Sequence, residues 1–124
     1  MQLTKSILFF TAAFSATAYA DCFESGAYPS QQSKDSAKRK VPKFCARRLV
    51  GDYAAGQART HCLSDGVDFR WDFLTQLRPD VQDRPLPLDE CISGLTKEID
   101  GCDRGGDSTY DNWHYKADIN KGPC

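Results

Sequence analysis

The chain has 124 residues, with 16 basic and 17 acidic side chains, a formal net charge of −1 and six cysteines. This near balance of charge excludes the strongly basic surface on which nucleic-acid-binding domains depend. The length is typical of one domain, and no apolar stretch is long enough to span a bilayer.

The first residues have the features of a secretory signal peptide. Lys5 supplies a positive charge, residues 6–14 form a short apolar run, and residues 18–20 (Ala-Tyr-Ala) form a small-x-small cleavage pattern. We therefore expect residues 1–20 to be removed and residues 21–124 to form a single secreted, extracellular, cysteine-rich domain. The sequence does not indicate an oligomeric state.

All six cysteines lie in the expected mature chain. An even number of cysteines in a short secreted chain indicates a disulfide framework, and no Cys-x-x-Cys or close His/Cys spacing indicates a zinc site. The sequence leaves many pairings open. One hypothesis pairs the cysteines as Cys22–Cys91, Cys45–Cys62 and Cys102–Cys124.

The N-terminal half of the domain is predicted to contain a strand and a helix. Residues 22–26 are expected to form a short strand, and residues 33–50 are expected to be mostly helical. Pro42 interrupts this segment, so that a helix either begins there or kinks there. The apolar residues that share one helical face are Val41, Phe44, Cys45, Leu49 and Val50.

A hairpin gives the clearest strand signal. Residues 61–64 lead into Asp65-Gly66, a dipeptide typical of hairpin turns. In residues 67–73, apolar and charged side chains alternate strictly, which predicts a half-buried strand. Residues 78–88 contain three prolines and are expected to be a loop.

The C-terminal part is predicted to contain a second helix and a last strand. Pro87 followed by two acidic residues is typical of a helix start, and Gly101 is a candidate C-cap. Residues 103–111 are expected to be a polar loop, and residues 113–118 alternate as a strand. The expected core stripe of the helix is Leu88, Cys91, Ile92, Leu95 and Ile99.

This order of elements predicts an α+β fold. We expect an antiparallel sheet of about four strands with two helices packed on one face, stapled by disulfides.

Aromatic and polar residues near the last strand are the best binding candidates. Sugars stack on aromatic rings and bind carboxylate, amide or imidazole groups through their hydroxyls, while aromatic residues are also ordinary core residues. The candidate glycan-binding residues are Asp107, Tyr110, Asp111, Asn112, Trp113 and His114.

A cluster of basic residues occupies the first helical segment. Three interpretations stay open: a solvated helix face, attraction to anionic glycans or membrane surfaces, and proteolytic processing after Lys38-Arg39. The cluster comprises Lys34, Lys38, Arg39, Lys40, Lys43, Arg47 and Arg48.

Other chemical sites are less well supported by the sequence. A small secreted ribonuclease would use two histidines, a carboxylate and an arginine, which here would be His61, Asp68 or Asp72, Arg78 and His114. Asp118-x-Asn120-x-Gly122 resembles the start of an EF-hand loop, but a structural turn is the simpler interpretation. Three further aspartates offer oxygen ligands for a cation, and these are Asp103, Asp107 and Asp111. We expect no cofactor, metal ion or catalytic residue.

Residues 88–124 contain a motif-like pattern that consists of Cys91, Leu95, Glu98, Ile99, Gly101, Cys102, Gly105, Gly106, Trp113, Tyr115, Ala117, Asp118, Asn120, Gly122 and Cys124. This pattern resembles that of the Y-three-like domain family of small secreted fungal glycan-binding proteins. Upstream, Cys45, Tyr53, Gly56 and Cys62 extend it, and Ile119 stands where the family usually has proline. The resemblance implies an α/β sandwich, secretion, disulfides and lectin-like glycan binding.

The sequence thus favours a secreted, non-enzymatic glycan-binding protein, a fungal effector or defence protein. One alternative is a virulence effector or toxin that binds a host or competitor protein through the basic helix. The other is a small secreted ribonuclease-like hydrolase.

Overall fold

The structure is a computed structural model that describes residues 20–66 and 68–124, and these residues form seven strands and two helices. The expected signal peptide therefore lies outside the described residues, except for Ala20. The strands are β1 (Ala20–Cys22), β2 (Gly51–Tyr53), β3 (Ala58–Ser64), β4 (Phe69–Leu77), β5 (Arg84–Leu86), β6 (Gly105–Tyr110) and β7 (Trp113–Lys121). The helices are α1 (Gln31–Phe44), the π-helical turn η1 (Cys45–Leu49) that continues it, and α2 (Leu88–Gly101).

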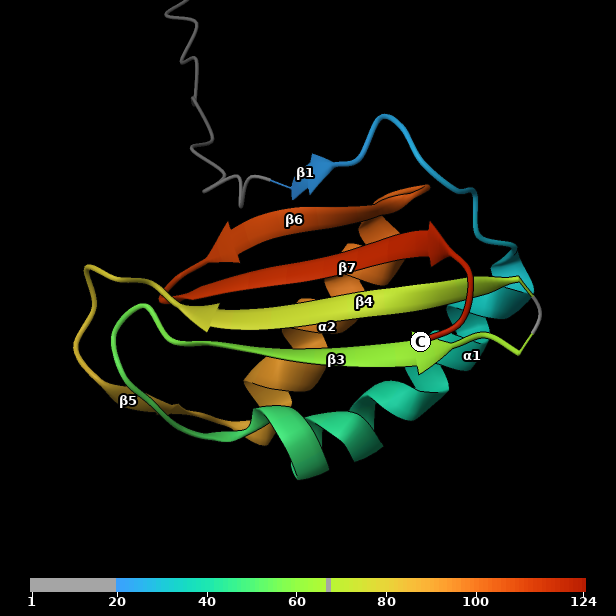
Figure 1. Cartoon of the computed structure of the whole chain (residues 1–124). Helices are drawn as coiled ribbons and strands as arrows, with labels where there is room; N and C mark the ends of the chain where they lie inside the picture. Colours follow the sequence, from blue (N-terminus) through green and yellow to red (C-terminus); the bar gives the residue numbers. More distant parts are fainter. Residues whose placement is uncertain (1–19, 67) are drawn as a thin grey trace, which may run out of the picture.

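An antiparallel five-stranded sheet forms one layer and the helices form the other (Figure 1). The strand order is β1-β6-β7-β4-β3, so the two hairpins β3–β4 and β6–β7 meet through their longest strands. Strands β2 and β5 form a separate two-stranded sheet. The predicted α+β fold with both helices on one face is confirmed.

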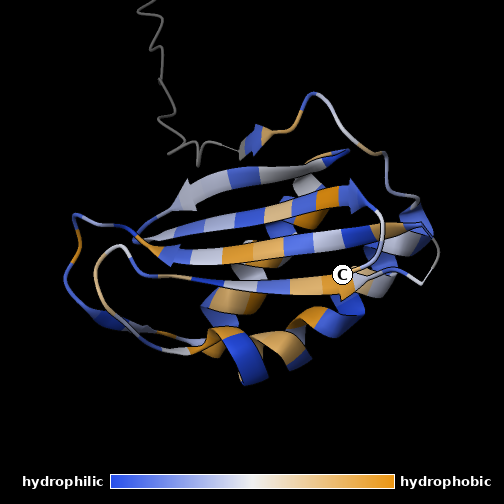
Figure 2. Ribbon diagram, in the orientation of Figure 1, coloured by the Kyte–Doolittle hydropathy of each residue, from blue (hydrophilic) through white to orange (hydrophobic). Residues whose placement is uncertain are grey.

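Strict alternation in β4 and β7 separates a core face from an open face (Figure 2). In β4, Trp71, Phe73 and Leu77 are buried beneath the helices, as the period of two predicts. The side chains between them point to the face that no helix covers. The predicted hairpin around Asp65-Gly66 is also confirmed, because β3 and β4 pair on either side of it. Val67, which was expected in the second strand, lies outside the described residues, and β4 begins at Phe69.

Helix α1 continues past Pro42 and then passes into the wider π-helical turn η1. Since Pro42 lies inside the helix, the hypothesis that a helix begins there is wrong. The Val50 N–H donates to the Cys45 carbonyl over 3.0 Å, a bond that spans five residues and marks a π turn. This wider turn buries Cys45 and Leu49 and leaves Arg47 and Arg48 exposed.

Helix α2 buries Cys91, Leu95 and Ile99 of its predicted core stripe, with two differences. Leu88 is 44% exposed because it is the first helical residue, whereas Glu98 is buried. Gly101 is the last helical residue, and the extended residue Cys102 caps the helix, so the expected glycine C-cap is wrong.

Strand β6 lies where a polar loop was expected. Its core-facing positions are small because α2 passes close: a Cβ on Gly106 would lie 2.6 Å from Glu98 Oε2 and 2.8 Å from Cys102 Sγ. A strand with glycine and serine on its inner face lacks the apolar alternation by which strands are recognised. Three further boundaries differ: the first strand ends at Cys22, β5 lies in the proline-rich segment, and β7 continues to Lys121.

The six cysteines form three disulfides, as predicted, but each predicted pair is wrong. The observed pairs are Cys22–Cys102, Cys45–Cys91 and Cys62–Cys124. They join β1 to the end of α2, η1 to α2, and β3 to the C-terminal tail. Pairing follows spatial proximity across elements, which cysteine spacing in the sequence does not encode.

Within the part of the chain that the structure describes, neither helix has the length and apolarity needed to cross a membrane.

Candidate functional site

The hairpin between β6 and β7 carries the predicted binding residues. Asp111 and Asn112 form its two-residue turn, with Asp111 at φ 51°, a left-handed conformation that aspartate tolerates. Arg78 fixes this turn, since its Nη1 donates to the Asp111 carbonyl and its backbone N–H to the Asn112 carbonyl, both over 3.0 Å.

Trp113 belongs to the core. Its side chain is 2% exposed and meets the Tyr53 ring edge-on, with centroids 4.9 Å apart and planes at 84°. A sugar cannot stack on a ring that both layers cover. The expectation that Trp113 is part of a binding platform is therefore corrected, because its position on β7 points it toward the helices.

Tyr110 and Asp111 line a hollow against α2, which we call the tyrosine–carboxylate pocket. Its volume is about 220 Å³. Helix α2 supplies the opposite wall, and Tyr115 and Gly94 form the floor. The remaining lining residues are Asp89, Glu90, Ser93, Lys97, Tyr110 and Asp111.

Close packing between Gly94 and Tyr115 creates this floor. A Cβ on Gly94 would overlap the Tyr115 ring, so only glycine lets the ring lie against the helix. The sequence analysis missed the wall on α2, where Glu90, Ser93 and Lys97 repeat at helical spacing on one face. This polar stripe is the pattern in the sequence from which the wall could have been predicted.

The pocket combines negative charge with neutral phenols. Burial raises the pKa of Tyr115 well above its ordinary value, and the nearby Glu90 and Asp111 carboxylates raise it further. Burial likewise raises the pKa of Tyr110. Among the described residues, Lys97 is the one cation in the lining, and its Nζ lies 5.0 Å from the Tyr110 ring centroid. The pocket thus offers oxygen acceptors and aromatic surface.

Asp107 and His114 lie on the open face of the sheet, away from this pocket. The two side chains form an ion pair, and Thr109 Oγ1 lies 3.1 Å from His114 Nδ1. They border a separate hollow with Asp21 and Phe23. The predicted binding set is therefore divided between two faces, because neighbouring residues of a strand point to opposite sides.

The residues of a ribonuclease-like site are not brought together. His61 pairs across the sheet with Phe73 and faces the helices, where its ring stacks on Phe44 at 4.6 Å. His114 lies on the opposite face. Arg78 holds the β6–β7 turn.

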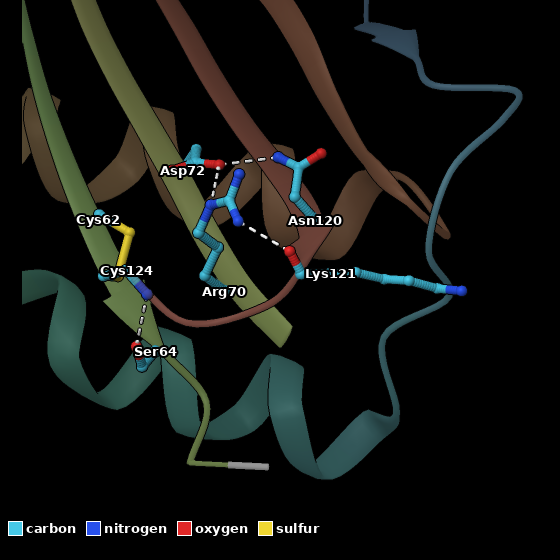
Figure 3. Close-up of a disulfide and its surroundings, with 7 residues drawn as sticks. All are labelled: Cys62, Ser64, Arg70, Asp72, Asn120, Lys121 and Cys124. Atoms are coloured by element: carbon cyan, nitrogen blue, oxygen red, sulfur yellow. Dashed lines mark hydrogen bonds and ion pairs between the residues drawn. A yellow bond between two sulfur atoms is a disulfide. The ribbon is translucent and has the colours of Figure 1, made fainter. Parts of the chain in front are cut away.

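Polar residues on the open face tie the C-terminal tail to the sheet (Figure 3). Asn120 Nδ2 donates to Asp72 Oδ2 over 2.8 Å and to Asp118 Oδ2 over 3.1 Å. Arg70 pairs with Asp72 and donates to the Lys121 carbonyl over 2.8 Å. Asp118 and Asn120 are strand residues, so their interpretation as a turn is wrong.

No metal-binding group of three or more His, Cys, Asp or Glu side chains is assembled among residues 20–66 and 68–124. The three aspartates considered for a cation border three separate hollows, Asp103 beside β1, Asp107 on the open face and Asp111 against α2.

Comparison with known proteins adds no relative. No protein-family model matches the chain, and no curated protein matches it in sequence.

Proposed function

We propose that the protein is a secreted glycan-binding module that holds one neutral or amino sugar in the tyrosine–carboxylate pocket. The observation that carries the proposal is the convergence of three carboxylates and two tyrosine rings in one hollow. These carboxylates belong to Asp89, Glu90 and Asp111.

Carboxylates in this arrangement accept hydrogen bonds from sugar hydroxyls. Charge-assisted hydrogen bonds of this kind are about twice as strong as neutral ones. The Tyr110 ring offers apolar surface, and a sugar that stacks on it takes the place of the flexible Lys97 ammonium. Three acids against one lysine disfavour sialylated or sulfated sugars, and they favour a protonated amine.

The size of the pocket limits the ligand. At about 220 Å³ it falls below the range of roughly 300–1,000 Å³ that holds drug-sized molecules. It therefore fits a single ring, such as the end of a glycan chain, while the rest of the chain stays in solvent.

Two sequence features support the extracellular part of the proposal. Residues 1–20 have the pattern of a signal peptide, and the three disulfides are compatible with an oxidising compartment. The resemblance of residues 88–124 to the Y-three-like family supports glycan binding, since that family includes a lectin-like member.

A glycan array followed by calorimetry on the best ligand tests this function. We expect binding to neutral or amino-sugar ends, and Asp111→Asn should weaken it by about tenfold or more, since a lost charge-assisted bond is worth about 1.5–3 kcal/mol. Asparagine tolerates the left-handed backbone of this turn, so the hairpin is preserved.

Asp107→Asn is the matched control, because it removes the same charge from the other face of the same hairpin. It should leave glycan affinity unchanged. If the folded wild type binds no glycan, the function is wrong. If Asp107→Asn abolishes binding and Asp111→Asn does not, the assigned pocket is wrong.

A further inference from the structure

A second hollow, which we call the basic recess, lies between the end of the first helix and the edge strand β3. Its volume is about 320 Å³. Phe44, His61 and Leu63 form an apolar floor, in which Phe44 is 5% exposed and stacks on His61 with centroids 4.6 Å apart. Exposed cations form the rim, and these are Lys40, Lys43, Arg47 and Arg48.

These four cations are unlike the other lysines of α1, which have partners. Lys34 Nζ donates to the Cys102 carbonyl over 2.9 Å, and Lys38 Nζ pairs with Asp100 over 2.9 Å. Within residues 20–66 and 68–124, none of the four rim side chains forms a hydrogen bond or ion pair, and no acidic residue lines the recess. The rim therefore concentrates positive charge on a chain whose net charge is −1.

The backbone fixes where this charge lies. The π turn that ends at the Val50 N–H directs Arg47 and Arg48 outward, and the buried disulfide Cys45–Cys91 ties the turn to α2. π turns occur frequently at functional sites. The floor is held equally firmly, because Phe44 also packs on Phe73 of the central strand.

We propose that the basic recess binds a small amphipathic anion, one with an aromatic or short aliphatic body and a single sulfate, sulfonate, carboxylate or phosphate head. The body covers the apolar floor and displaces water from it. The head meets guanidinium groups, whose planar donors match such oxyanions. Because Phe44 is recessed, a flat bilayer does not reach the floor, whereas one projecting ring does.

The proposal is independent of glycan binding. The basic recess and the tyrosine–carboxylate pocket share no lining residue and have opposite charge. Its volume lies at the lower end of the range for small-molecule sites, roughly 300–1,000 Å³, which suits a body of one or two rings.

Three probes separate the contributions of body and head in calorimetric titrations of the oxidised protein. Anilinonaphthalene sulfonate has both, phenylnaphthylamine has similar rings without the charge, and inorganic sulfate has the charge without rings. We expect one molecule of anilinonaphthalene sulfonate to bind per chain. Its affinity should be about tenfold or more higher than that of either other probe. The difference in affinity between the sulfonate and phenylnaphthylamine should shrink near 1 M salt, where the screening length is about 3 Å.

Variants then locate the site. The double variant Arg47→Gln, Arg48→Gln should lose about tenfold in sulfonate affinity with little change for the neutral amine. Leu63→Asn should weaken both ring probes. Lys121→Gln removes one positive charge from an exposed residue elsewhere and should change neither affinity.

Nuclear magnetic resonance shifts on adding the sulfonate should cluster on η1 and β3, which distinguishes the recess from adventitious binding to loosened protein. Equal affinity for sulfonate and neutral amine, or full sulfonate affinity in the double arginine variant, would overturn the proposal. Equal affinity for inorganic sulfate would show that the floor takes no part and would overturn it as well. Asp111→Asn should leave sulfonate binding intact even if no glycan is ever bound.

Discussion

Gly94→Ala changes one methyl group at the contact between α2 and the sheet. In an exposed helix interior this substitution stabilises a protein by about 1 kcal/mol, because alanine restricts the unfolded chain and favours the helix. At Gly94 the added Cβ overlaps the Tyr115 ring. Tyr115 is 3% exposed, so its ring can move away from the added carbon only by giving up packing contacts.

The two effects oppose each other, and the steric one is larger. Overpacking a filled core costs about 1–3 kcal/mol and occasionally more, and here the new carbon would overlap several ring atoms at once. Taking the upper part of that range and subtracting the gain in helix propensity leaves a net loss of about 1–2 kcal/mol. For a domain of this size, the melting temperature should fall by roughly 5–15 °C.

Thermal and urea unfolding followed by tryptophan fluorescence measure this loss. Gly101→Ala is the matched control, since it lies in the same helix and its Cβ would meet no atom within 4 Å. It should be neutral or stabilise the protein by up to about 1 kcal/mol. Combining Gly94→Ala with Tyr115→Leu should cost less than the sum of the single changes.

The reasoning fails if Gly94→Ala is as stable as Gly101→Ala. It also fails if the losses from Gly94→Ala and Tyr115→Leu add without coupling, because the ring would then not be what the methyl group meets. The first result would mean that the helix moves away from the sheet at no cost, which close packing forbids.

Two further predictions concern buried groups. Burial raises the pKa of Glu98 above its ordinary value of 4.5, so the folded protein retains a proton that the unfolded chain releases, and stability falls as pH rises from about 4.5 through the folded-state pKa. Glu98→Gln should therefore stabilise the protein near neutral pH but not below pH 4.5 in urea unfolding, whereas parallel pH curves for the two proteins would contradict this. Replacing Cys45 and Cys91 by alanine should lower the free energy of unfolding by about 1–3 kcal/mol more than replacing Cys62 and Cys124 does. The two disulfides close loops of similar length, with sequence separations of 46 and 62, but of these two pairs only Cys45–Cys91 is wholly buried. Equal urea midpoints for the two double variants would refute that order.

Local patterns in the sequence were sufficient for most of the fold. Alternation from Phe69 to Phe73 predicts a half-buried strand because successive side chains of a strand point to opposite faces of the sheet. The dipeptide Asp65-Gly66 likewise predicts a tight turn from its own backbone preferences. The apolar face of α1 follows in the same way from the 3.6-residue helical period. Six cysteines in a short chain predict three disulfides, but not which partners they choose.

Strand β6 shows where local pattern stops being informative. Its inner face carries glycine and serine because α2 already fills that space. Ser108 Oγ donates there to the carboxylate of Glu98, ten residues earlier in the chain, over 2.9 Å. No alternation of apolar residues marks such a strand, so the sequence predicts a polar loop over residues 103–111. Once β6 exists, Asp107 and Tyr110 are required to face opposite sides.

The sequence by itself determined the class of the fold, the β3–β4 hairpin, the helical faces and the chemistry available for binding. Only the tertiary structure decided that Trp113 is core, that Tyr110 and Asp111 join α2 in one pocket, and that Arg47 and Arg48 border an apolar floor. The physical reason is that a side chain's environment is set by the elements packed against it. Those elements come from distant parts of the chain, and their approach depends on volume and register rather than on local pattern.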